Sequence, residues 1–164
     1  MIGYKTIILL FIPIILSAPG CVKTEIKQEM VLKPIPMKEK ELLIRTISSE
    51  SSECYLDAWR VAQVIRNRCK FHNKTVHEII YQKGQFSGIN TRLWNLNLNS
   101  VQAQRIANIV DSVWNNITPD SLLLSDSTLF FCNPKLVKQK TLNWFNKMEL
   151  DEVSENNHHY YKIK

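Results

Sequence analysis

Two glutamates separated by a pair of serines, Glu50 and Glu53, are the residues of this chain best suited to acid and base chemistry. Glu50 ends a segment with apolar residues at helical spacing and comes just before the apolar-rich stretch of residues 56–68. Burial against apolar groups raises the pKa of a carboxyl, so that it stays protonated and acts as a general acid near neutral pH. Glu53 and Asp57 instead suit the exposed start of the next helix. Glu50 is therefore better placed than Glu53 for acid and base chemistry.

The histidines and cysteines do not form a recognisable metal site. The histidines lack the HExxH spacing of zinc proteases, and the cysteines contain no CxxC pair, so we predict no metal and no cofactor. These residues are His72, His77, His158, His159, Cys21, Cys54, Cys69 and Cys132. We expect the cysteines to be structural or incidental; with Cys21 lipidated, the other three can form at most one disulfide.

Two helices must position the glutamates. Leu43, Ile44 and Ile47 recur at helical spacing and predict a helix with one buried face that begins near Glu41 and ends at Glu50. Residues 56–68 are so densely apolar that this helix must be nearly surrounded by the rest of the domain. It is the predicted central helix of the core.

The remainder of the chain predicts three more helices, a loop and a small amount of sheet. Thr75 to Glu78 is a capping box that opens a short helix before Gly84, and a longer helix starts near Ser100. Residues 85–99 are polar and irregular and predict a functional loop. Residues 122–131 and 158–163 are candidate strands, and Asn133-Pro134 predicts the start of a further helix. The expected fold class is α+β, predominantly α, with a small β element.

The first forty residues have the composition of a targeting segment and a linker. Lys5 precedes about ten apolar residues, too few for a membrane span, followed by small residues and Cys21. We expect a signal peptide over residues 1–20, followed either by a lipid on Cys21 or by ordinary cleavage. Residues 21–40 are rich in Lys, Glu and Pro and predict a tether, which leaves residues 41–164 as the folded domain.

Length and charge limit the possible functions. A chain of 164 residues has room for one compact domain beside its processing segments. The net charge of +6 attracts polyanions such as cell wall or anionic lipid. The basic residues are scattered rather than clustered with aromatics, so we expect no nucleic-acid partner, and we expect a monomer.

Three segments together resemble one known family. These are Glu50-Ser51-Ser52-Glu53, the stretch 61–68 that ends in Asn67-Arg68, and the stretch 76–87 that runs from Val-His-Glu-Ile-Ile-Tyr-Gln into Gln85-Phe86-Ser87. Their order and spacing resemble the SleB/CwlJ-type cell-wall hydrolases. The resemblance is strong over residues 42–94 and weaker to the end, through residues 130–134 and 158–161.

The resemblance implies a lysozyme-like domain of the lytic transglycosylase type, acting on the glycan strands of peptidoglycan. It puts Glu50 in the place of the family's essential glutamate, acting as general acid and then as base. The family often has Glu-x-x-x-Glu where this chain has one residue fewer, which keeps Glu53 as the alternative. A second known form, Glu-small-small-x-Cys, fits Glu50 to Cys54 without a gap.

The resemblance also suggests substrate-binding residues. Gln85 and Ser87 supply groups that hydrogen-bond N-acetyl groups, and Phe86 supplies a face for sugar stacking; the alternative is a loop anchor in which Phe86 packs inward. Tyr81 and Trp94 are cleft aromatics or core residues. Asn67, Arg68 and His158 are expected to be structural.

The expected location is the cell envelope, with the protein held at the membrane through Cys21 or, alternatively, freely secreted. A non-catalytic envelope lipoprotein that binds glycan is the alternative function. The two functions differ in whether the purified protein releases soluble fragments from peptidoglycan.

Overall fold

The computed structural model describes residues 35–51 and 54–163. The expected signal peptide, Cys21, most of the expected tether and Glu53 lie outside the described residues. The described elements, in chain order, are α1 (Met37–Glu50), α2 (Tyr55–His72), α3 (Val76–Ile80), α4 (Val101–Trp114), a 3-10 turn (Asp120–Leu122), β1 (Thr128–Cys132), α5 (Gln139–Phe145), β2 (Glu149–Val153) and β3 (His159–Lys162). The predicted α+β class with mostly helix is confirmed.

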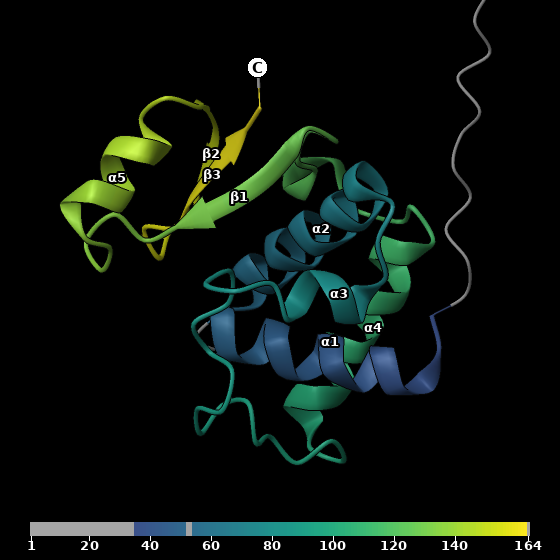
Figure 1. Cartoon of the computed structure of the whole chain (residues 1–164). Helices are drawn as coiled ribbons and strands as arrows, with labels where there is room; N and C mark the ends of the chain where they lie inside the picture. The colour runs from purple at the N-terminus through teal and green to yellow at the C-terminus, as the bar shows by residue number, and fades with distance from the viewer. Residues whose placement is uncertain (1–34, 52–53, 164) are drawn as a thin grey trace, which may run out of the picture.

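Helix α2 is the centre of the helical part, as the sequence predicted. Every residue from 57 to 69 is buried, and α1, α3 and α4 all pack against this helix. Figure 1 shows these four helices as one body. Helix α1 begins at Met37, four residues before the expected start, so its first turn includes the end of the predicted tether. Glu50 is the last residue of this helix.

The sheet is small and antiparallel, with strand order β1-β3-β2. Strand β3 fits the predicted strand, but β1 starts only at Thr128, so the expected strand over residues 122–131 was too long. The reason is Gln63 of α2, whose side chain donates to the carbonyl of Leu122 at 2.8 Å and accepts from the N–H of Leu124 at 2.9 Å. These bonds hold the segment against α2 instead of in the sheet.

The predicted helix at Asn133-Pro134 was wrong. The Asn133 side chain accepts from the N–H of Lys135 at 3.1 Å, and its carbonyl accepts from the N–H of Leu136 at 2.9 Å, which closes a turn. The helix α5 starts later, at Gln139. Strand β2 was missed because its residues are mostly polar and partly exposed, which weakens the period-two pattern of an edge strand.

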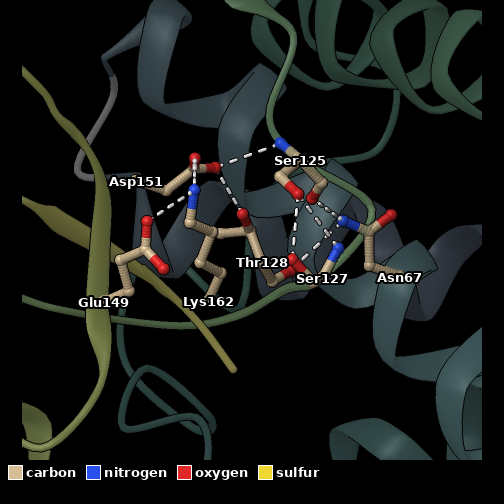
Figure 2. Close-up of polar contacts among 7 residues, drawn as sticks. All are labelled: Asn67, Ser125, Ser127, Thr128, Glu149, Asp151 and Lys162. Carbon is tan, nitrogen blue, oxygen red and sulfur yellow. Dashed lines mark hydrogen bonds and ion pairs between the residues drawn. The ribbon is translucent and has the colours of Figure 1, made fainter. Parts of the chain in front are cut away.

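The start of β1 is fixed from two sides (Figure 2). The Asn67 side chain of α2 donates to the carbonyls of Ser125 and Thr128 at 2.9 and 3.2 Å. From the sheet side, Asp151 of β2 accepts from the N–H of Ser125 at 3.0 Å and from the hydroxyl of Thr128. Lys162 of β3 lies 3.6 Å from Asp151 and holds that carboxylate in place. The sheet is therefore joined to the central helix by polar contacts as well as by packing.

Candidate functional site

Glu50 is the last residue of α1 and is partly buried. Leu43 and Ile47, on the buried face of the same helix, are fully inaccessible, so the apolar face anchors the turn that ends in Glu50. The Glu50 carboxylate reaches the loop that follows α3, where Oε1 accepts a hydrogen bond from the backbone N–H of Gly88 at 2.6 Å. A residue from one end of α1 is thus joined to a loop 38 positions later in the chain.

Gly88 is required by this close approach, and sequence reasoning missed it. A Cβ atom at residue 88 would lie 2.4 Å from Oγ and 2.5 Å from Cβ of Ser49, and 3.1 Å from Oε1 of Glu50. Contacts below 3.0 Å are not tolerated, so only glycine lets this backbone N–H reach the carboxylate. A glycine directly after the Gln-Phe-Ser segment was the available signal.

Burial raises the pKa of Glu50 above its ordinary value. The N–H of Gly88, the electrostatic effect of His158 and the N–H of Ser87 act in the opposite direction, but they do not outweigh burial. A carboxyl with a raised pKa keeps its proton to higher pH than an exposed glutamate. This is the property that a general acid needs.

A second acid, Asp57, is buried where the sequence predicted exposure. Asp57 was expected at an exposed helix start, but its side chain is fully buried. One oxygen lies 3.0 Å from Nδ1 of His158, and the other accepts from the hydroxyl of Tyr160 at 2.9 Å. Although burial acts to raise the pKa of Asp57, hydrogen bonds from His158, Ser154 and Tyr160 lower it below its ordinary value. The partners from β3 and the turn before it therefore keep this carboxylate ionised inside the protein.

The Asp57 and His158 pair explains the structural role expected for His158. It ties the start of α2 to the beginning of β3, more than 100 residues later, and fixes the orientation of the imidazole. Because the charge of His158 also acts on the Glu50 carboxyl, the pair forms part of the electrostatic surroundings of the candidate acid.

Gln85 is exposed, and a buried arginine holds its side chain. The guanidinium of Arg68 donates to Oε1 of Gln85 at 2.6 Å and also to Oε1 of Gln82. Burial lowers the pKa of Arg68 to about 10, so the group remains charged at neutral pH. Arg68 therefore fixes the loop from within, as expected for a structural residue, and Gln85 reaches the surface with one of its polar atoms already engaged.

Two of the expected sugar-binding aromatics require correction. Phe86 is 6% exposed and Trp94 9% exposed, and both belong to the main hydrophobic core. For Phe86 this is the inward-packed alternative, because its ring lies against Phe131 and under the guanidinium of Arg68. The backbone carbonyl of Trp94 accepts from Arg45 of α1 at 3.0 Å, which anchors the loop. Neither ring presents a face for sugar stacking.

Tyr81 and Ser87 do reach the surface. Tyr81 is 52% exposed, and its ring rests against His77 at a centroid distance of 4.7 Å. Ser87 is exposed beside Gly88, next to the Glu50 carboxylate. Of the five predicted binding residues, Ser87 is thus the one whose backbone contacts the candidate acid, while Gln85 lies in the same loop and is held by Arg68.

The described residues hold no group of three or more His, Cys, Asp or Glu side chains that could bind a metal ion. Cys54, Cys69 and Cys132 are all free thiols, and burial raises the pKa of Cys69 to about 12, so that this thiol stays protonated. Within the described ranges, no helix has both the length and the apolar character needed to cross a bilayer.

Comparison with protein families gives one match. A family model described as Cell Wall Hydrolase matches residues 52–162. The match includes α2 and all three strands and begins two residues after Glu50. No curated protein and no solved structure matches the chain.

Proposed function

The chain belongs to the cell wall hydrolase family, and from this premise we propose that it cleaves peptidoglycan glycan strands with Glu50 as its general acid and base. The bond proposed for cleavage joins N-acetylmuramic acid to N-acetylglucosamine. A glycosidic oxygen is a poor leaving group unless it receives a proton. The observation that supports this role most strongly is the partly buried Glu50 carboxyl, whose pKa is raised and whose position is fixed by the N–H of Gly88.

A second carboxylate would serve a conventional glycosidase as nucleophile or base. Asp57 is close in sequence but unsuited to that role, because its side chain is fully buried and both of its oxygens are engaged by His158 and Tyr160. This favours a lytic transglycosylase, in which the substrate supplies the nucleophile. Glu53 lies outside the described residues and is the alternative acid.

The proposed reaction needs one carboxyl group in two protonation states. Glu50 first donates its proton to the oxygen of the leaving N-acetylglucosamine as the glycosidic bond breaks. The Glu50 carboxylate then accepts the proton of the muramic acid 6-hydroxyl as its oxygen bonds to C1. The product is a 1,6-anhydromuramic end, and Glu50 is again protonated for the next cycle.

Product analysis tests this proposal. Purified protein is incubated with peptidoglycan, and the soluble fragments are separated and weighed by mass spectrometry. Fragments with anhydromuramic ends are expected. Fragments with reducing ends and no anhydromuramic ends would show that the protein is a muramidase and not a transglycosylase. Binding without release of any fragment would support the non-catalytic glycan-binding lipoprotein and overturn the enzyme.

We also propose that the protein is exported to the cell envelope and anchored by a lipid on Cys21. The support is the amino-terminal sequence alone. Labelling with a radioactive or clickable fatty acid tests the anchor, since the wild type should be labelled and Cys21→Ser should not. Secretion of unlabelled protein into the medium would indicate ordinary signal cleavage.

A further inference from the structure

Helix α5 carries an exposed tryptophan that the proposed function does not yet use. All four tryptophans lie within the described residues, and Trp144 is 45% exposed while Trp59 and Trp94 are 8% and 9% exposed. An exposed aromatic ring is common on a protein surface and is not by itself a binding site, so the surroundings of Trp144 decide whether it has a partner. The question is which partner this surface fits.

The ring of Trp144 is held in a defined orientation. Its centroid lies 5.1 Å from that of Phe130 at 87°, and 5.0 Å from that of Phe145 at 74°, so both neighbours meet it edge to face. Phe145 is itself buried against Tyr161 of β3 at 4.8 Å. A ring fixed by two such contacts loses little conformational freedom when a ligand stacks on it.

The surrounding segment is basic. Residues 133–148 contain four lysines and no acidic residue, and all four lysines are exposed. Peptidoglycan presents sugar rings with apolar C–H faces together with the carboxylates of its peptide stems. An aromatic face beside positive charge matches both parts of that polymer.

The Trp144 surface is connected to the candidate active site. The guanidinium of Arg68 lies 5.6 Å from the ring centre of Phe130, which contacts Trp144, and 5.7 Å from that of Phe86 in the loop before Gly88. Arg68 also binds Gln85 of that loop. In Figure 1, α5 and the carboxyl end of α1 lie on the same side of the molecule. A strand bound at Glu50 could thus extend along this side toward α5.

We infer that Trp144 is a sugar-stacking platform that binds the same glycan strand at a distance from the cleaved bond, with the lysines of residues 133–148 receiving its stem carboxylates. The inference rests on the proposed function and adds a subsite to it. It also adds a second exposed aromatic beside Tyr81 to the candidate sugar-binding residues, whereas Phe86 and Trp94 are buried.

The test measures binding separately from cleavage. Glu50→Gln protein is sedimented with purified peptidoglycan, with and without Trp144→Ala. Loss of one stacked aromatic should weaken binding about tenfold. Trp144→Phe, which keeps a ring, should retain most of the affinity. Phe71→Ala, which removes another exposed aromatic (57% exposed), should change nothing. Thermal unfolding by circular dichroism verifies that each variant is folded.

The inference is overturned if folded Trp144→Ala binds peptidoglycan as tightly as its parent, or if Phe71→Ala loses as much affinity as Trp144→Ala. It is also overturned if Trp144→Ala loses binding only to phosphatidylglycerol vesicles, which would assign the surface to a membrane. The failure of the proposed function would look different. In that case the wild type would release no fragments while peptidoglycan binding still depended on Trp144.

Discussion

Replacing Gly88 with alanine should displace the loop from Glu50 and damage both stability and activity. The added Cβ would lie 2.4 Å from Oγ and 2.5 Å from Cβ of Ser49. Ser49 cannot turn away, because its Cβ is fixed by the helix backbone and its hydroxyl donates to the carbonyl of Thr46 at 2.9 Å. The loop backbone must therefore move by about 1 Å to restore ordinary contact, since atoms in protein interiors pack at about 3.5–4.0 Å.

This displacement has two costs. Overpacking of a well-packed site costs about 1–3 kcal/mol. The 2.6 Å hydrogen bond from Gly88 to the Glu50 carboxylate lengthens as well, and a bond to a charged group contributes about 1.5–3 kcal/mol. Because a strained loop keeps part of that bond, we expect a total loss of about 2–4 kcal/mol. A misplaced Glu50 should also reduce kcat by at least about tenfold.

The assays are urea unfolding for stability and release of soluble fragments from peptidoglycan for kcat. Gly84→Ala is the matched control in the same loop. Gly84 has φ of +74° but nothing within 4 Å of its Cβ position, so this variant should cost about 1 kcal/mol and leave kcat unchanged. Adding Ser49→Gly to Gly88→Ala should restore part of the loss, because it removes the two closest contacts. The reasoning is refuted if Gly88→Ala matches the wild type, or if Gly84→Ala harms kcat equally.

Four further predictions concern charge and loop position. Because the pKa of folded Glu50 is raised, kcat/KM should fall on the alkaline side at a pH above 4.5; a fall centred at 4.5 would show an unperturbed acid. The same shift means that ionising Glu50 destabilises the fold as pH rises, so Glu50→Gln should unfold at higher temperature than the wild type at pH 7, with the difference vanishing below about 4.5. The pKa of Asp57 is lowered, so ionised Asp57 stabilises the fold above its ordinary pKa of about 3.8, and this stabilisation is lost as the pH falls. Asp57→Asn should therefore lower the free energy of unfolding by about 3–5 kcal/mol at pH 7, measured in urea. An equal loss at pH 3 would contradict this. Arg68→Met should release the side chains of Gln82 and Gln85 and raise KM for peptidoglycan. An unchanged KM would show that Arg68 does not position the loop for substrate binding.

The helical part could be predicted from sequence because buried faces repeat with the helical period. Leu43 and Ile47 locate α1, and the apolar density of residues 56–68 identifies α2 as central. The sheet was harder to predict. The side chain of Gln63 forms hydrogen bonds with the backbone of Leu122 and Leu124, so the segment before β1 packs on α2 and does not join the sheet. The local sequence pattern does not reveal these long-range bonds.

The candidate site was predictable only in part, for the same physical reason. Glu50 follows from its place at the end of an apolar helix face. Whether Phe86 and Trp94 face sugar or core depends on what packs against them, and residue type does not determine it. Asp57 has the local features of an exposed helix start, but partners more than 100 positions away bury it. Gly88 matters through a close approach that only the folded loop reveals.

The central claim is that Glu50 performs the acid and base steps of glycan cleavage, and comparison of Glu50→Gln with Glu53→Gln tests it most directly. Both variants are incubated with peptidoglycan, and soluble fragments are quantified by mass spectrometry beside the wild type. Glu50→Gln should remain folded and bind peptidoglycan, yet release at least about 100-fold less than the wild type, while Glu53→Gln stays active. Full release by Glu50→Gln, or loss of release in Glu53→Gln alone, would contradict the assignment.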